Sequence, residues 1–174
     1  MFRRRRRAKA DEQEPEVYQM RERLVDIGED YWIETNRGRR AYRVDNKVLR
    51  FRDTFVIHMP DGTEVARMKK RPVRLRDTYE IKRPGLPEAT VKKALISPLR
   101  DRLVLEADDV GEIHVKGNIV DHEYTFETED GHKIAEASKR WFRVRDTYGV
   151  EVDPAADAAL ILAATVAIDQ LSHD

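Results

Sequence analysis

The sequence predicts a mainly β fold with one α-helix, in which a closed antiparallel barrel surrounds the helix. Three observations predict this fold class. Short segments alternate between apolar and polar residues with period two, a unit of about 40 residues occurs twice, and one apolar run lies near the C-terminus. Strands therefore make up most of the chain, and a single apolar helix needs a place inside them.

The strand signal is an alternation of apolar and polar side chains. Phe55, Ile57 and Met59 share one face of a segment, as do Tyr124 and Phe126 of another. One apolar and one polar face per strand is typical of an antiparallel sheet with one side in water. Pairs such as Asp-Gly separate the segments and supply the positive φ that tight turns need. Many short strands at this spacing favour a barrel or a sandwich.

The chain contains an internal duplication. Residues 42–81 and 111–150 align without a gap at an offset of 69 residues, and ten of the last 21 aligned positions are identical. We expect the two copies to form equivalent sets of strands about a pseudo-two-fold axis. This expectation includes like local structures at Asp77 and Asp146, which begin the repeated Asp-Thr-Tyr sequence.

The C-terminal segment predicts one helix over residues 154–171. Asp153 is the candidate N-cap, Pro154 suits the first helical position, and Asp157 suits the positive end of the helix. Residues 158–168 are apolar all round, and such a helix is buried on every side. Because a membrane span needs about 20 apolar residues, we expect this shorter run to lie inside the barrel.

Composition bounds the possible functions. The 174 residues fit one domain, and the absence of Cys excludes disulfide scaffolds, Cys-ligated zinc, iron–sulfur clusters and thiol catalysis. The chain has 33 Lys plus Arg and 33 Asp plus Glu. This balance argues against a dedicated nucleic-acid binder, which normally carries a basic excess.

The first 16 residues differ from the rest and form a predicted disordered, charged tail before a domain over residues 17–174. The tail carries six positive and four negative charges and almost no apolar residues. No apolar stretch follows it, so it does not resemble a secretory signal. It is either a solubilising tail or a contact for anionic lipid or nucleic acid. The candidate contact residues in the tail are Arg3, Arg4, Arg5, Arg6 and Arg7.

The duplicated unit carries a resemblance to a known family, together with residues 21–33, 121–126, 138–150 and 160–170. These stretches resemble the LURP-one-related family, and the resemblance covers about residues 18–173. It implies a tubby C-terminal-like fold, in which a barrel of about twelve antiparallel strands surrounds a central hydrophobic C-terminal helix. The wider superfamily includes tubby domains, which bind phosphoinositides, and phospholipid scramblases. This chain lacks the tubby lipid-binding motif and the membrane segment and cysteines of scramblases, so no site residue carries over.

The sequence shows no recognisable catalytic or metal-binding pattern. The five histidines lack the spacing of metal ligands, and no nucleophile elbow, phosphate-binding glycine loop or marked carboxylate pair is present. We therefore expect no enzyme activity, metal or cofactor. His122 shares the parity of Tyr124 and should be partly buried. Asp169, which follows the apolar run, should lie at the barrel rim, bonded to a Lys or Arg side chain or to backbone N–H groups.

Basic clusters are the remaining candidates for a binding site. Lys70 and Arg71 are the repeat equivalents of Lys139 and Arg140, and Lys69 precedes the first pair. Their recurrence means either a shared anion site or duplicated surface. The sequence predicts a non-enzymatic binding module for anionic phospholipid or a protein partner, in the cytoplasm or peripheral at a membrane. The alternatives are an enzyme with an unrecognised site and nucleic-acid contact through the arginine tail.

Overall fold

A computed structural model describes residues 14–22, 30–45, 54–73, 76–93 and 103–173. Within these residues the chain forms twelve strands, a short 3-10 helix and one α-helix. The strands are β1 (Glu16–Arg21), β2 (Tyr31–Thr35), β3 (Arg40–Asp45), β4 (Thr54–His58), β5 (Glu64–Val73), β6 (Arg76–Lys82), β7 (Ala89–Lys93), β8 (Leu103–Ala107), β9 (Gly111–Asn118), β10 (Glu123–Thr128), β11 (Lys133–Ser138) and β12 (Thr147–Val152). The helices are η3 (Lys139–Trp141) and α1 (Ala158–His173).

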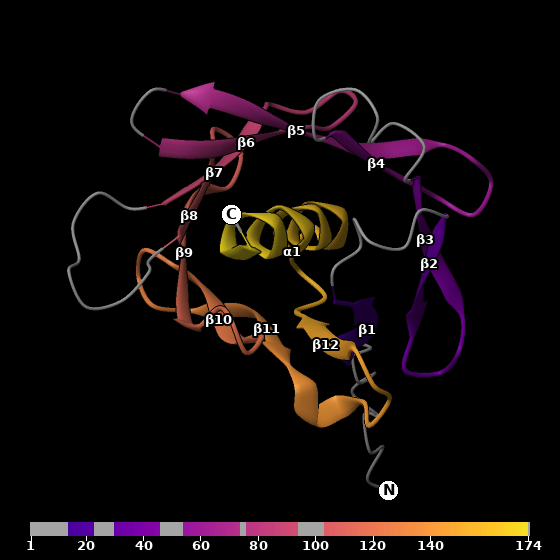
Figure 1. The fold of residues 1–174 in the computed structure, drawn as a ribbon. Coiled ribbons are helices and arrows are strands. Elements are labelled where there is room, and N and C mark those ends of the chain that lie inside the picture. Colours follow the sequence, from indigo (N-terminus) through magenta and orange to yellow (C-terminus); the bar gives the residue numbers. More distant parts are fainter. Residues whose placement is uncertain (1–13, 23–29, 46–53, 74–75, 94–102, 174) are drawn as a thin grey trace, which may run out of the picture.

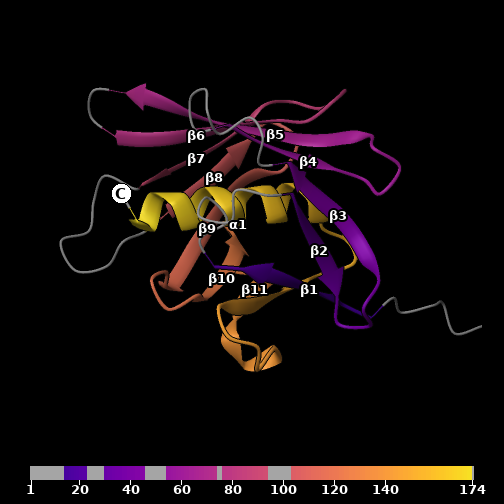
Figure 2. The same ribbon diagram turned by 45° about the vertical axis from the view of Figure 1, so that its right-hand side comes forward.

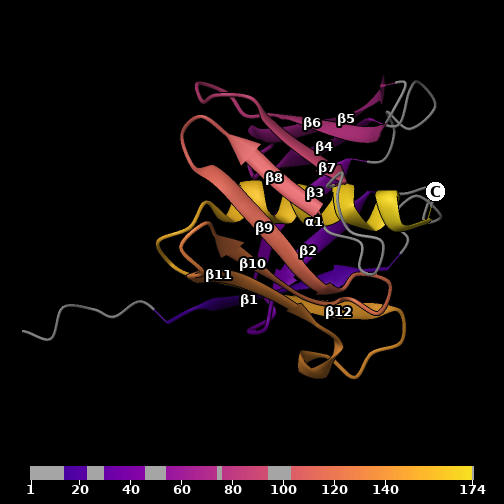
Figure 3. The same ribbon diagram turned by 90° about the vertical axis from the view of Figure 1, so that its left-hand side faces the viewer.

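The strands close into a barrel around α1, as the sequence predicted. Each strand pairs antiparallel with its neighbours in the chain, and β1 pairs with β12 to complete the ring. Figure 1 shows α1 enclosed by the ring, and the turned views in Figures 2 and 3 show the helix running through its interior. Closure removes the exposed strand edges that an open sheet would present.

The core is the contact between α1 and the inner faces of the strands. Leu160, Leu162 and Ile168 are each at most 1% exposed, although they point in different directions around the helix axis. Thr165 is also buried, and its hydroxyl donates to the carbonyl of Ile161 at 2.8 Å, so its polar group is satisfied. Each buried Leu or Ile of this kind contributes roughly 1.5–3 kcal/mol. The all-round apolar character of the helix is thus explained by its enclosure.

Because consecutive strands are antiparallel, they end alternately at the two ends of the barrel. The connections after even-numbered strands lie at the end where α1 begins, which we call the N-terminal mouth. The odd-numbered strands end at the opposite end of the barrel, where α1 finishes, which we call the C-terminal mouth. Each mouth therefore collects residues that are far apart in sequence.

The two copies of the repeat share a strand register. At the offset of 69 residues, β4, β5 and β6 correspond to β10, β11 and β12, and the pair Met68–Ile81 corresponds to Ala137–Val150. Both copies also have a bulge at the same place, after Ile57 and after Phe126. Met59 lies just past the end of β4, in the turn that leads to β5, so it is 39% exposed rather than on the inner face.

The equivalence ends after Lys69 and Ser138. In the first copy β5 continues and pairs with β6, with Pro72 opposite Asp77. In the second copy the chain leaves the ladder, forms η3 and returns through Asp146, which has a φ of 59°. The expectation of like local structures at Asp77 and Asp146 is therefore wrong.

The helix begins four residues later than the sequence predicted. Asp153 does not cap it: its Oδ1 accepts from the N–H of Ala155 at 2.8 Å, which closes a turn before the helix. Asp157 is the N-cap, because its Oδ1 accepts from the N–H of Leu160 at 3.2 Å. At the other end of the chain β1 begins at Glu16, so the last residue of the predicted tail belongs to the barrel.

Candidate functional site

The structure does not bring the predicted basic residues together. Lys69, Lys70 and Arg71 lie on β5, whereas Lys139 and Arg140 lie on η3, which follows β11. Because β5 and β11 are six strands apart in a ring of twelve, the two groups lie on opposite sides of the barrel. A single site shared by both groups is thus excluded. The tail arginines Arg3, Arg4, Arg5, Arg6 and Arg7 lie outside the described residues.

Several of these basic side chains have acidic partners. Lys139 Nζ lies 2.7 Å from an oxygen of Glu22, and Arg71 forms an ion pair with Glu80. Arg140 donates to Glu136 at 2.9 Å, and its guanidinium also lies over the ring of Trp141. These pairs reduce the charge that each side chain offers to an external anion.

The connection between β11 and β12, residues 139–146, projects from the barrel wall, and we call it the η3 loop (Figures 2 and 3). It carries four basic residues, of which Arg143 and Arg145 follow the paired Lys139 and Arg140. Val144 lies between the two arginines and is 61% exposed. The loop therefore presents cations and an apolar side chain next to each other.

The base of the η3 loop is fixed by hydrogen bonds and packing. Glu123 Oε1 accepts from Ser138 Oγ at 3.0 Å and from the N–H of Lys139 at 2.9 Å. Trp141 packs over Gly149 of β12, where an added Cβ would approach the indole to 2.8 Å. A side chain at position 149 would displace the indole, so this glycine is needed for the close approach. The loop is thus held in a defined position.

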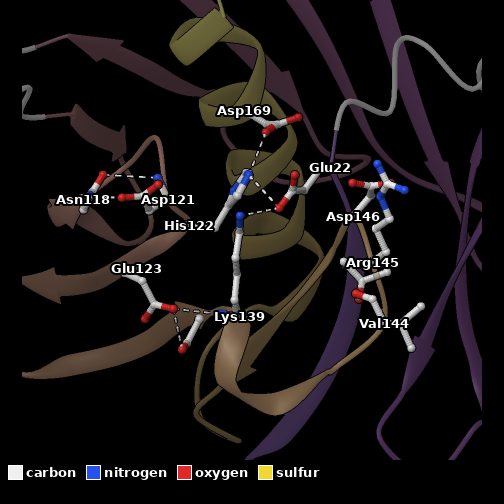
Figure 4. Close-up of polar contacts among 12 residues, drawn as sticks. Glu22, Asn118, Asp121, His122, Glu123, Lys139, Val144, Arg145, Asp146 and Asp169 are labelled. Atoms are coloured by element: carbon white, nitrogen blue, oxygen red, sulfur yellow. Dashed lines mark hydrogen bonds and ion pairs between the residues drawn. The ribbon is translucent and has the colours of Figure 1, made fainter.

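A polar cluster lies beneath the loop at the C-terminal mouth (Figure 4). It consists of the buried His122 and Asp169, the partly buried Glu22 and the exposed Lys139. His122 Nε2 lies 3.7 Å from Asp169 Oδ1 and 3.9 Å from Glu22 Oε1. The same Glu22 oxygen meets Lys139. We call these four residues the His122 cluster.

Backbone geometry places the imidazole in this cluster. His122 has a φ of 54°, and its N–H donates to the carbonyl of Ile119 at 3.2 Å. The preceding turn is fixed by Asn118, whose side-chain amide donates to Asp121 at 2.6 Å. The imidazole then stacks on Tyr148 at 4.1 Å between ring centroids. The predicted burial of His122 is confirmed, since it is 3% exposed.

Burial also sets the ionisation of the surrounding groups. Burial, followed by the negative charge of Asp169, raises the pKa of Tyr124 above its ordinary value. Burial raises the pKa of Tyr148 as well, with smaller contributions from Tyr124 and Asp169. Both phenols are therefore neutral near pH 7. Asp169 is 2% exposed, and the side chain of His122 lies beside it. The sequence predicted a Lys or Arg side chain or backbone N–H groups as its partner, and did not include a histidine.

A second buried ionic group lies at the N-terminal mouth. Arg83 is 4% exposed and donates to Asp109 at 2.7 Å, to Asp157 at 3.0 Å and to the carbonyl of Pro87 at 2.9 Å. It thereby ties the N-cap of α1 to the β6–β7 and β8–β9 connections. Sequence reasoning missed this group, because its members are far apart in the chain and none belongs to a motif.

The described residues give no sign of a metal site or of a membrane-spanning helix. No group of three or more His, Asp or Glu residues in the described part of the chain could hold a metal ion. No helix within the described ranges has the length and apolar character needed to cross a membrane.

Comparison with known proteins identifies the family. The model of the LURP-one-related family matches residues 16–169, which is most of the chain. The chain belongs to the LURP-one-related family. The fold of this LURP-one-related chain is also similar to the X-ray structure of a protein from Arabidopsis thaliana, with a TM-score of 0.67 and 19% sequence identity over 91% of this chain and 92% of that one. The search of curated proteins gave no match.

Proposed function

We propose that this LURP-one-related domain is a non-enzymatic binding module that contacts anionic phospholipid at a membrane surface through the η3 loop. The observation that carries the proposal is the composition of the exposed loop. Arg143 and Arg145 flank Val144 just before β12, and all three side chains are exposed. A membrane interface accommodates this combination, because lipid headgroups attract cations while an apolar side chain enters the layer below.

The charges of the loop favour an anionic surface. Lys139 and Arg140 are neutralised by carboxylates, so the main attraction comes from Arg143 and Arg145. Arg145 lies 3.7 Å from Asp146, but its side chain is 94% exposed and this pair is weak. Each basic residue near an anionic leaflet contributes about 1 kcal/mol, so the two arginines together supply about 2 kcal/mol.

Such an energy corresponds to weak, reversible binding, and stable attachment needs a second contact. The tail residues Arg3–Arg7 could supply it, since a polybasic segment adds to an apolar anchor. The proposed place of action is therefore the cytoplasmic surface of a membrane, where anionic lipids are concentrated. The burial of His122 and Asp169 supports a structural role for that pair rather than contact with a substrate.

Vesicle sedimentation tests the proposal. The full chain is mixed with phosphatidylcholine vesicles with and without phosphatidylserine, at about 0.1 M and about 0.5 M NaCl. We expect binding only to the phosphatidylserine vesicles at the lower salt concentration. The double substitution Arg143→Gln/Arg145→Gln should weaken it about 30-fold, the equivalent of about 2 kcal/mol.

A matched control removes the same charge from the opposite mouth. Arg37 and Arg39 are exposed in the β2–β3 connection, so Arg37→Gln/Arg39→Gln changes net charge equally. This variant should bind nearly as well as the wild type. Equal losses in both variants would show that overall charge, and not the η3 loop, determines binding.

A further inference from the structure

Two adjoining cavities lie at the N-terminal mouth, beside the turn that leads from β12 into α1. One has a volume of about 280 Å³, and its apolar lining includes Ile134, Leu160 and Ile161. The other has a volume of about 500 Å³ and is lined partly by carboxylates. Asp153 and Ala156 line both cavities, so the apolar and the polar cavity are adjacent at this turn.

The polar cavity carries an excess of negative charge. Glu14, Glu16 and Asp153 line it, and Arg37 is the single basic residue among its described lining residues. Arg37 lies 3.7 Å from Glu14, while Glu16 bonds to Arg39. No ion pair to Asp153 is found within the described part of the chain, and its Oδ1 accepts only a backbone hydrogen bond from Ala155. Asp153 is therefore the carboxylate best placed to meet an external cation.

We propose that the adjacent cavities bind a cationic amphiphile, with an aliphatic chain in the apolar cavity and an ammonium group beside Asp153, which lines both. The volume of the apolar cavity limits the length of the aliphatic chain of the ligand. At roughly 30 Å³ for a group the size of water, 280 Å³ holds about nine such groups. An alkyl chain of about eight carbons fits this space.

Charge selects the amine over a fatty acid of the same length. A carboxylate head would meet Asp153, Glu14 and Glu16, and like charges at short range disfavour binding. The alkyl chain of the ligand supplies affinity, because each methylene group that it buries tightens binding about fourfold. The site therefore requires both a cationic head and an alkyl chain of several carbons.

Isothermal titration calorimetry of the full chain with octylammonium, octanoate and butylammonium tests the proposal. Octylammonium should bind at least about tenfold more tightly than octanoate, which has the wrong charge, and than butylammonium, which leaves half of the apolar cavity empty. This comparison uses only the wild-type protein and so does not depend on the folding of a variant. Equal affinity for octylammonium and octanoate, or no binding at millimolar octylammonium, would overturn the proposal.

Two variants locate the site. Asp153→Asn keeps a side-chain oxygen for the Ala155 N–H but removes the charge, so octylammonium should bind about tenfold more weakly. Ala155→Phe places a ring over the apolar cavity that Ala155 lines and should abolish binding.

The matched control is Asp61→Asn. Asp61 lies in another turn of the same mouth, and its Oδ1 accepts from the N–H of Thr63 at 2.9 Å, in the manner of Asp153. It lines neither cavity, so its substitution should leave the affinity unchanged. An equal loss in Asp61→Asn and Asp153→Asn would show a general charge effect and refute the assigned site.

Discussion

The N-cap of α1 gives a sharp test of how the helix is fixed inside the barrel. Asp157 accepts from the N–H of Leu160 at 3.2 Å and from the guanidinium of Arg83 at 3.0 Å. Loss of a cap costs about 1 kcal/mol, and loss of a hydrogen bond to a charged group costs about 1.5–3 kcal/mol. Asp157→Ala should therefore lower the free energy of unfolding by about 2.5–4 kcal/mol.

Two further substitutions separate these contributions in urea denaturation. Asp157→Asn retains a good capping residue and removes the charge, so it should cost only about 1.5–3 kcal/mol. Asp153→Ala removes one exposed turn bond and should cost about 0.5–1 kcal/mol. If Asp153→Ala destabilised the protein as much as Asp157→Ala, the helix would begin at Asp153 and the assigned cap would be wrong.

Three other predictions concern stability. Leu162 is fully buried, so Leu162→Ala should cost about 2–5 kcal/mol in urea denaturation, and Leu162→Asp should prevent folding at ordinary temperature. Gly149→Ala should cost about 1–3 kcal/mol, because the new Cβ displaces Trp141, and it should increase the quenching of indole fluorescence by acrylamide. The hydrogen bond from Arg83 lowers the pKa of Asp109 in the folded protein below its ordinary value of 3.8. The ionised Asp109 therefore stabilises the folded state fully above pH 3.8, and this contribution is lost as the pH falls through the lower pKa of the folded state. Urea denaturation below about pH 4 should consequently be less pH-dependent in Asp109→Asn than in the wild type.

The sequence predicted the architecture because the strongest signals are periodic and local. Period-two alternation defined the strands, and the all-round apolar run from Ala158 to Ile168 placed the helix inside them. The start of the helix was not predictable in the same way. Asp153 and Asp157 both have side chains that can bond nearby backbone, and Arg83, 74 residues before Asp157, holds the second of them at the N-cap.

The candidate sites depend more strongly on long-range contacts. The parity of His122 predicted its burial, but nothing local indicated its contact with Asp169 across the barrel mouth. Likewise, the repeat drew attention to Lys139 and its equivalent Lys70, although the two lie on opposite sides of the barrel. Duplication preserves sequence and register, whereas closing the ring separates the copies in space.

The emission of Trp141 reports most directly whether the η3 loop meets a membrane. In a Trp32→Phe variant, Trp141 is the remaining tryptophan of the chain and lies at the partly exposed base of the loop. The proposed contact predicts a shift to shorter wavelength and reduced acrylamide quenching on addition of phosphatidylserine-containing vesicles, both reversed at about 0.5 M NaCl. Unchanged Trp141 emission under conditions where the protein sediments with these vesicles would contradict it.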